Sequence, residues 1–506
     1  MYVVNPQRFG YQVAIHNSCT CNELVSLHNR HLIDRTLREY CKDYMLGKFK
    51  EVSGGWAIPS ERMSYDEVIR CYRGAKKRMY TFAKLELVKY GLRSSDANVR
   101  MFVKFDKYDA EEIATKAPRA IQYRHARYNL VLASYLKSFE AKFYQLPSKN
   151  GLRVITKGLN PVEVAGLLLE KSRLFDEPVY LSCDHSKFDS SVNVDHLKFE
   201  HGIYNKVFKD TQLKFLLKKQ LYNKGFSRNG IRYSVLGTRM SGDYNTGLGN
   251  CLLNRAVLES MLIGLKHEIM LDGDDSIVIV ERRDLRKVDL DHFRRCGFTT
   301  EVTQTEDISE VTYCKRRLCH SNPPMMVRNP IRAMSNMAVT AYNYGALGFK
   351  YWALGALECE RLSNPGIPIF RKFPVAKRII RDSDYHRKLE NVCDTVECSE
   401  VALSTCWNLS IDTIRMVERD MKYLGWNCDN RIQDAIKHLK GQVNQNNIIH
   451  ESSHALSTQQ ASLSGRFCAL HASASECWDE IGSPNCGTTS IYGSTSKPGE
   501  PSNTTL

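Results

Sequence analysis

Residues 239–250 read RMSGDYNTGLGN, a run of small and polar residues that opens a longer apolar segment. The pattern predicts a flexible loop at Ser241–Gly242, followed by a helix over residues 244–265. Thr246 and Asn250 are four residues apart, so they share one face of that helix. Taken alone, the same pattern fits a capped helix that carries two incidental polar residues.

A β-hairpin is predicted downstream of this helix, over residues 268–280. Two β-favouring apolar runs enclose Asp272–Gly273, a favoured turn pair, and Asp274–Asp275 follow directly. Adjacent acidic residues in a tight turn between apolar strands are costly unless a cation lies beside them. Taken alone, however, an Asp-Gly-Asp-Asp turn is more often simply solvated.

A second acidic segment lies upstream, where a strand is predicted over residues 178–184. Asp184 ends this strand, and Asp189 follows five residues later. Phosphoryl transfer to a sugar hydroxyl needs divalent cations that steady the attacking and leaving oxygens, and carboxylates hold those cations. Because Mg²⁺ prefers oxygen ligands, acidic residues aimed from strand ends into one site fit this chemistry.

The chain is basic over most of its length. Its 506 residues include 71 Lys and Arg against 56 Asp and Glu, a net charge of +15. Such a charge favours a polyanionic partner, most commonly nucleic acid, although a basic solvated surface is the alternative. Hydrophobic residues make up 42% of the chain, which excludes disorder for most of it. The 17 Cys residues are scattered without zinc-ribbon spacing, which indicates reduced thiols.

Other regions carry weaker signals. Residues 72–90 predict a basic amphipathic helix with four apolar residues on one side, namely Met79, Phe82, Leu85 and Val88. No segment approaches the roughly 18 uncharged apolar residues of a membrane helix, so we expect a soluble chain or one recruited to membranes by another protein. Residues 442–506 are rich in Ser, Thr, Asn, Gln and Gly and predict a mostly disordered polar tail.

Together the three central segments resemble palm motifs A, B and C of the RNA-dependent RNA polymerases of positive-strand RNA viruses. They are Asp-x4-Asp at 184–189, Ser-Gly-x3-Thr-x3-Asn at 241–250 and Gly-Asp-Asp at 273–275. Residues 239–250 are particularly similar to the tombusvirus-like enzymes. So is KAPRAIQYRHARYN, residues 116–129, which matches the basic fingers motif F of that family.

Two shorter segments extend the resemblance, which covers roughly residues 10 to 440. YRGAKKR at 72–78 is similar to another fingers segment of the family, and Tyr313-Cys314-Lys315 stands where motif E, the primer grip, belongs. The resemblance implies an α+β right-hand polymerase with fingers, a palm of antiparallel sheet and helices, and a helical thumb. The implied division is fingers 1–177 with motif F near 103–129, palm 178–329 with a fingers insertion near 201–236, thumb 330–441 and tail 442–506.

The resemblance also implies roles for individual residues. Asp184 and Asp274 would ligate two Mg²⁺ ions, or Mn²⁺, with Asp275 assisting. A ribose gate would form from Asp189, Ser241, Thr246 and Asn250, since small hydroxyl and amide groups can read the 2′-OH of RNA. The nucleotide channel would be lined by Lys104, Lys107, Lys116, Arg119, Arg124 and Arg127, because triphosphates need cations along their path. For the general acid of motif D, Lys287, Arg294 and Arg295 all compete.

The implied reaction adds ribonucleoside triphosphates to an RNA 3′-OH while copying an RNA template. Its partners would be template and nascent RNA, ribonucleoside triphosphates and other viral replication proteins. The protein would be located in the host cytoplasm, where another protein would recruit it to membrane-bound replication complexes. One alternative is a reverse transcriptase, which shares the palm but should lack the set Asp189, Ser241 and Asn250. Another is a degenerate palm that serves as an RNA-binding scaffold, against which intact Asp184, Asp274 and Asp275 argue.

Overall fold

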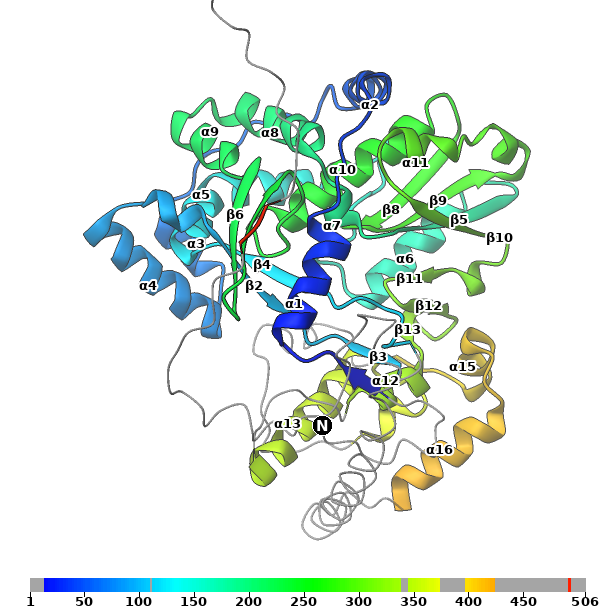
Figure 1. Ribbon diagram of the computed structural model, residues 1–506. Coiled ribbons are helices and arrows are strands. Elements are labelled where there is room, and N and C mark those ends of the chain that lie inside the picture. Colours follow the sequence, from blue (N-terminus) through cyan, green and yellow to red (C-terminus); the bar gives the residue numbers. More distant parts are fainter. Residues whose placement is uncertain (1–12, 110–111, 338–344, 374–395, 424–489, 493–506) are drawn as a thin grey trace, which may run out of the picture.

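The computed structural model describes residues 13–109, 112–337, 345–373, 396–423 and 490–492. Its fold is of the α+β class (Figure 1). At its centre is a four-stranded antiparallel sheet in the order β10-β5-β9-β8. The strands are β5 (Pro178–His185), β8 (His267–Asp272), β9 (Asp275–Glu281) and β10 (Thr300–Thr305).

Two helices cover opposite faces of this sheet. Side chains alternate between faces along a strand, so Leu181 and Val278 pack toward α10 (Thr246–Met261). Tyr180 and Ile279 point the other way, toward α6 (Pro161–Ser172). Both central strands, β5 and β9, are therefore almost continuously buried. The strand, hairpin and long helix expected around residues 178–280 are all present.

The turn of the β8–β9 hairpin differs by one residue from the expectation. Asp272 and Asp275 form the last cross-strand pair, so the two turn residues are Gly273 and Asp274. Gly273 has φ 75°, a conformation that Gly adopts readily and other residues adopt at a cost. A positive φ at the first turn position is typical of a type II′ hairpin turn. The shift places Asp274 at the tip and Asp275 at the start of a strand.

A second sheet joins segments that are distant in sequence. Its order is β14-β7-β6-β2-β4, and β2 pairs in parallel with β6. Helix α1 (Thr20–Ser26) and the π-helical turn η2 (Leu27–His31) cover one face, where Leu27 packs against Met101 and Tyr233. The strands are β2 (Val99–Val103), β4 (Ala120–Tyr123), β6 (Tyr222–Ser227), β7 (Arg232–Leu236) and β14 (Ser490–Tyr492).

The last strand of this sheet comes from the polar tail, which was expected to be mostly disordered. Residues 490–492 pair in parallel with β7, so the tail contributes a short strand. The rest of the tail, residues 442–489 and 493–506, lies outside the described residues.

A third sheet and a group of helices lie at the lower end of the molecule in Figure 1. β11 and β12 form a hairpin at the segment that resembles motif E, and its turn residues Cys314 and Lys315 both have positive φ. Apolar residues of this region form a cluster separate from the central core. The elements are β11 (Thr312–Tyr313), β12 (Arg316–Cys319), β13 (Met325–Arg328), α12 (Pro330–Met337), α13 (Gly345–Ser363), η6 (Phe370–Lys372), α15 (Glu400–Trp407) and α16 (Ile411–Tyr423).

The remaining elements include β1 and β3, which pair with each other, and η5, which packs near β12. They are β1 (Val13–Ile15), α2 (Glu39–Val52), α3 (Tyr65–Arg70), α4 (Gly74–Tyr90), η3 (Ser94–Ala97), β3 (Lys107–Asp109), α5 (Ala126–Phe143), α7 (Phe188–Ser191), α8 (Val194–Phe208), α9 (Thr211–Lys218), η4 (Arg282–Lys287), α11 (Asp291–Arg295) and η5 (Ile308–Glu310). Within the described ranges, no helix combines the length and apolar character that crossing a bilayer requires.

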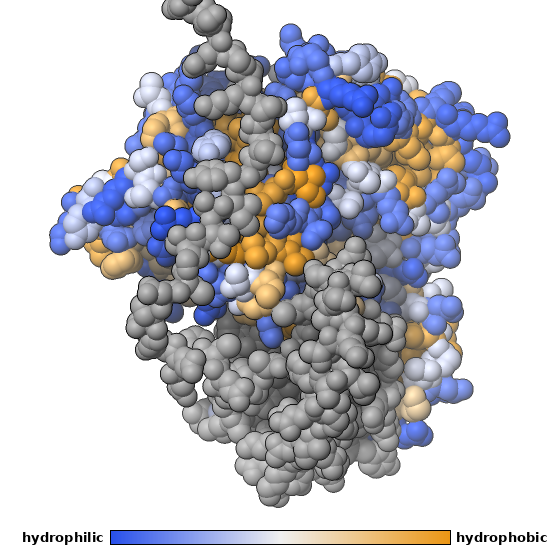
Figure 2. Space-filling view, viewed as in Figure 1, coloured by the Kyte–Doolittle hydropathy of each residue, from blue (hydrophilic) through white to orange (hydrophobic). Residues whose placement is uncertain are grey.

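Helix α4 forms as expected, but it packs on a different side. Its buried residues are Tyr80 and Ala83, whereas Met79, Phe82, Leu85 and Val88 are exposed. Residues three apart drift around a helix of 3.6 residues per turn, so these four do not form a straight stripe toward the core. Apolar residues accordingly remain visible among hydrophilic ones at the edge where α4 lies (Figure 2).

A buried ion pair joins α6 to the central sheet. The side chains of Lys171 and Glu268 are both 0% exposed, and they contact each other directly. Ser148 Oγ (2.8 Å) and Asn150 Nδ2 (2.7 Å) also donate hydrogen bonds to Glu268. Burial lowers the pKa of Lys171, and the charge of Glu268 opposes that effect.

We predict that Lys171→Met lowers the free energy of unfolding by about 3–5 kcal/mol, because it leaves a buried carboxylate without its cation. The double variant Lys171→Met/Glu268→Gln should recover most of this loss, since no buried charge remains. Urea unfolding followed by circular dichroism measures both. The control is Lys42→Met, which removes an exposed pair with Glu39 and should cost less than about 1 kcal/mol. Equal losses in Lys171→Met and Lys42→Met would contradict the prediction.

Candidate active site

The predicted metal-binding acids lie together at one end of the central sheet, where strands β5 and β8 end and β9 begins. Asp184 is near the end of β5, Asp274 is in the β8–β9 turn and Asp275 begins β9. The β5–β9 register pairs Cys183 with Ser276, so continuing it by one residue brings Asp184 beside Asp275. All three residues are exposed at this edge.

The closeness of these acids affects how Asp275 titrates. The pKa of Asp275 is raised to about 6, first by desolvation and then by the negative charges of Asp274, Asp272 and Asp184. Lys315, in the turn of the β11–β12 hairpin, opposes this effect. Carboxylates held this close repel one another, and a bound cation would relieve that repulsion.

The donor atoms suit Mg²⁺, although they do not form a complete cage. Mg²⁺ takes oxygen ligands and is usually held by one or two carboxylates together with substrate phosphates and water. In the described part of the chain, no group of three or more His, Cys, Asp or Glu side chains is arranged to hold a metal ion alone. The acids therefore fit a site that substrate phosphates complete.

Asn254 of α10 holds the acidic turn in place. Its amide nitrogen donates to the carbonyl oxygens of Gly273 (3.0 Å) and Asp274 (3.3 Å). Its side-chain oxygen is 3.0 Å from Nε2 of His185, the residue after Asp184. Burial lowers the pKa of His185, so the ring is neutral and can donate from Nε2. Asn254 thus connects both acidic segments. In the sequence, only its spacing of four residues from Asn250 indicated that it shares a helix face with the candidate site.

Asp189 and Asn250 meet directly, as expected. Asn250 Nδ2 donates to Asp189 Oδ1 at 2.8 Å. Arg239 Nε in turn donates to Asn250 Oδ1 at 3.0 Å, and the Arg239 guanidinium forms a buried ion pair with Glu200 of α8. Burial raises the pKa of Asp189, the Asn250 hydrogen bond lowers it, and the charge of Asp274 raises it further. Sequence reasoning missed Arg239 and Glu200, which orient this pair.

The two hydroxyl residues of the expected ribose gate are engaged differently. Ser241 Oγ accepts a hydrogen bond from the Gln122 backbone N–H at 3.1 Å, which leaves its own proton available. Thr246 Oγ1 donates to the Met240 carbonyl at 2.7 Å within the same loop. The structure therefore joins Asp189 and Asn250 to each other directly, whereas the Thr246 hydroxyl is bonded within its own loop.

Of the six expected channel cations, three lie at or near the surface in ion pairs. Lys104 Nζ is 2.9 Å and Arg119 Nε 3.4 Å from the carboxylate of Asp106, and Lys116 Nζ is 2.6 Å from Glu112. The charge of Arg119 lowers the pKa of Asp189, which places it beside the site. Lys107 Nζ lies 6.0 Å from the ring of Trp352 on α13, and burial lowers its pKa to about 8.

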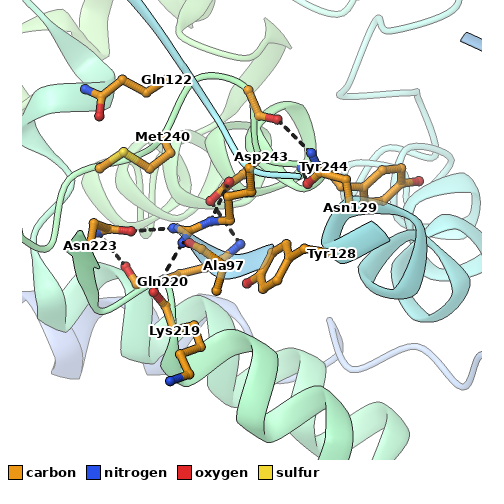
Figure 3. A network of polar contacts seen from close by, with 12 residues as sticks. Ala97, Gln122, Tyr128, Asn129, Lys219, Gln220, Asn223, Met240, Asp243 and Tyr244 are labelled. Atoms are coloured by element: carbon orange, nitrogen blue, oxygen red, sulfur yellow. Dashed lines mark hydrogen bonds and ion pairs between the residues drawn. The ribbon is translucent and has the colours of Figure 1, made fainter. Parts of the chain in front are cut away.

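Arg124 and Arg127 were wrongly expected to line this channel, because both are buried in ion pairs. Arg124 Nε donates to Asp243 Oδ1 at 2.8 Å, with neither side chain more than 4% exposed. Asn223 and the Ala97 carbonyl accept its other protons, and Figure 3 shows these groups gathered with Gln220. Arg127 pairs with Asp96 at 2.5 Å. These two cations hold the structure together and are not offered to a ligand.

Sequence reasoning also missed Arg30, in the π-helical turn η2. Its pKa is lowered by burial and by the charge of Arg119, while Asp106 and Asp189 act in the opposite direction. Arg30 therefore adds a cation beside Arg119 and Asp189. The three candidates for the general acid of motif D are all in ion pairs: Lys287 with Asp284, Arg294 with Asp291 and Arg295 with Asp289.

Carboxylates at adjoining strand ends, an amide–carboxylate pair beside them and cations nearby are the kinds of group that transfer of a phosphoryl or nucleotidyl group needs. Comparison with known sequences identifies the protein family. The profile of the family described as viral RNA dependent RNA polymerase matches residues 2–440. The chain belongs to this family.

Curated relatives carry the same name, RNA-directed RNA polymerase. That of Groundnut rosette virus (strain MC1) is 32% identical over 320 residues, which cover 61% of this chain and 38% of the relative. That of Carnation mottle virus is 32% identical over 400 residues, 74% of this chain and 51% of the relative. That of Tobacco necrosis virus (strain A) is 32% identical over 346 residues, 65% and 47% respectively. The chain spans about half the length of these relatives, or less.

The loop before α10 is locked to β4 by a close contact that only Gly allows. Gly242 N–H donates to the Gln122 carbonyl at 2.6 Å. A Cβ at Gly242 would lie 2.6 Å from Tyr123 Cβ and 2.7 Å from that carbonyl oxygen, too close for either to remain in place. At Gly247, by contrast, an added Cβ would meet its nearest neighbours at 3.5 Å, an ordinary contact.

We predict that Gly242→Ala destabilises the protein by about 1–3 kcal/mol, since the added methyl group forces β4 and the loop apart. Gly247→Ala, the matched control on the same segment, should change stability by less than about 1 kcal/mol. Chemical unfolding gives the energies, and hydrogen exchange of residues 120–123 should rise in Gly242→Ala alone. Equal exchange in the two variants would show that the contact does not fix β4.

Proposed function

We propose that this chain carries out template-directed RNA synthesis, joining ribonucleoside triphosphates to an RNA 3′-OH. The observation that carries the proposal is the meeting of Asp184 with Asp274 and Asp275 at one sheet edge, beside the Asp189–Asn250 pair. Family membership supports the same reaction. An assay of Mg²⁺-dependent, template-directed nucleotide incorporation tests it directly.

We assign the parts of a right-hand polymerase to the segments of the chain as follows. The palm, 178–329, contains all four strands of the central sheet. The insertion near 201–236 belongs with the fingers, 1–177, because β6 and β7 complete the sheet of β2 and β4. The thumb, 330–441, is supported by the separate apolar cluster around α13, α15 and α16, although part of it lies outside the described residues.

Each acidic residue has a distinct task in the proposed reaction. Asp184 and Asp274 would hold Mg²⁺ or Mn²⁺, with Asp275 assisting, and these ions when bound would activate the 3′-hydroxyl and stabilise the leaving pyrophosphate. Asn254 keeps the turn that carries Asp274 in register with β5. Arg119 and Arg30, both close to Asp189, would receive the triphosphate, since Arg can bind phosphate oxygens in bidentate fashion.

Asp189 and Asn250 would recognise the ribose. Arg239 and Glu200 hold Asn250 from behind, so its amide group keeps one orientation. Ser241 can still donate its hydroxyl proton to the sugar. A site built to bond the 2′-OH rejects the analogue that lacks it, because its own polar groups are then unpaired. This arrangement favours RNA synthesis over the reverse transcriptase alternative, and the exposed acids favour an active enzyme over a scaffold.

The proposed partners are template and nascent RNA, ribonucleoside triphosphates and other viral replication proteins. The net charge of +15 supports the nucleic-acid partners. The proposal also places the protein in the host cytoplasm, recruited to membrane-bound replication complexes by another viral protein, and this part rests on family membership alone.

We predict that Asp184→Asn or Asp274→Asn reduces nucleotide incorporation at least tenfold while RNA affinity stays within about twofold. The substitution removes a ligand charge without changing shape, whereas affinity comes mainly from basic residues. Primer extension and anisotropy with labelled RNA measure the two quantities. Asp291→Asn, at an exposed position of α11, is the control and should leave both unchanged. Incorporation near the wild-type rate in either site variant would reject the assignment.

We predict that Asn250→Ala and Asp189→Ala each lower the preference for a ribonucleotide over its 2′-deoxy counterpart. The loss of one hydrogen bond, about 1–3 kcal/mol, corresponds to roughly 5- to 150-fold in the ratio of kcat/KM values. Thr246→Val is the matched control, because its hydroxyl is bonded to Met240 and should leave the ratio unchanged. If all three variants reduce both substrates equally, the residues support folding and do not select the sugar.

A further inference from the structure

The sheet of β2, β4, β6 and β7 has a second face, opposite the one that α1 covers. On it, one register row runs through Tyr123, Arg100, Phe226 and Arg232. Arg100 is the cross-strand partner of Tyr123 on one side and of Phe226 on the other, and Phe226 is the partner of Arg232. Cross-strand partners point to the same side of a sheet, so aromatic and cationic side chains alternate across four strands. We call these four residues the aromatic–basic row.

The row is exposed and positively charged. Phe226 is 42% exposed and Tyr123 36%, which is unusual for aromatic residues inside strands. Neither Arg100 nor Arg232 forms an ion pair with a described residue. The four strands contain no acidic residue at all, and Lys224 adds another exposed cation to the same face. The face therefore carries cations that nothing on the sheet neutralises.

The row is continuous with the candidate active site. A cavity of about 660 Å³ is lined by Arg100 and Tyr123 of the row and also by Ser241 and Gly242 of the loop before α10. Tyr123 adjoins Gly242, whose loop leads into α10 and Asn250. Lys76 of α4, 4.6 Å from the ring of Tyr72, also lines this cavity. A ligand on the row would therefore reach the ribose-recognising residues along one path.

We propose that the aromatic–basic row binds single-stranded RNA, as the approach surface of the template before it is copied. This inference rests on the proposed function and extends it to a surface outside the catalytic centre. Bases can stack on Phe226 and Tyr123, because every base has a π-face, while Arg100 between the two rings and Arg232 on the far side of Phe226 bind the phosphates. Neighbouring strands are about 4.8 Å apart, so the row spans roughly 14 Å, the length of a short stretch of nucleotides.

The chemistry favours single-stranded RNA over other occupants. A duplex keeps its base faces stacked inside, so the aromatic rings could not reach them. A protein partner would meet one guanidinium group between the rings and a second beside Phe226, neither in an ion pair with a described residue, and burying them without acidic partners is costly. Single-stranded RNA satisfies both the rings and the cations.

The test measures binding of a fluorescein-labelled 12-nucleotide oligo(U) to the full chain by anisotropy, at several salt concentrations. Phe226→Ala should weaken binding about 5- to 100-fold, Phe226→Leu should weaken it similarly, and Phe226→Tyr should bind like wild type. Arg232→Gln should reduce the slope of log affinity against log salt by about 0.7. Phe215→Ala removes an equally exposed aromatic residue on α9, away from the row, and should change nothing.

Several results would overturn the proposal. They are wild-type affinity in Phe226→Ala, an equal loss in Phe215→Ala, or an equal loss for a 12-base-pair RNA duplex. A change of oligomeric state in Phe226→Ala with unchanged RNA affinity would show that the face binds protein. Primer extension by the wild type separates the two proposals. If the wild type incorporates nucleotides but the row variants bind RNA normally, the row alone is rejected. If it does not incorporate but Phe226→Ala loses RNA binding, the proposed function alone falls.

Discussion

The buried ion pair between Arg124 and Asp243 is the contact on which the site depends most. A guanidinium group in the interior must keep its carboxylate, because either charge alone would be strongly unfavourable there. The pair ties the end of β4 to the loop before α10, and Asn223 adds the start of β6 to the same point (Figure 3). Three segments that are distant in sequence are thereby fixed as one body.

Helix α10 connects this ion pair to the end of the central sheet that carries the acidic residues. Asn250 and Asn254 lie one turn apart on the same face, and the first contacts Asp189 while the second contacts the β8–β9 turn. The neutral amide groups of one helix, α10, therefore position both segments of acidic residues. The carboxylates stay exposed and close together, which is what a cation-binding edge requires.

Much of this arrangement could be predicted from local patterns, because alternation and helical spacing are properties of neighbouring residues. The β5 strand, the β8–β9 hairpin and α10 follow from such patterns. The proximity of Asp184 to Asp274 and Asp275 follows instead from the resemblance to the polymerase family. The roles of Arg124 and Arg127 could not be predicted, because their partners are set by the tertiary fold: Asp243 is 119 residues from Arg124. Likewise, the exposed side of α4 depends on where α5 packs and not on α4 itself.

The parallel pairing of β2 with β6 has a consequence for how the chain is made. Val99 pairs with Gly225, so β2 leaves the ribosome long before its partner exists. At about 5–20 residues per second, the delay is roughly 6 to 25 s. During that interval the edge of β2 that β6 will cover stays open, and an open strand edge is prone to pairing with other chains. That edge is exposed in the nascent protein until residue 227, the end of β6, has emerged.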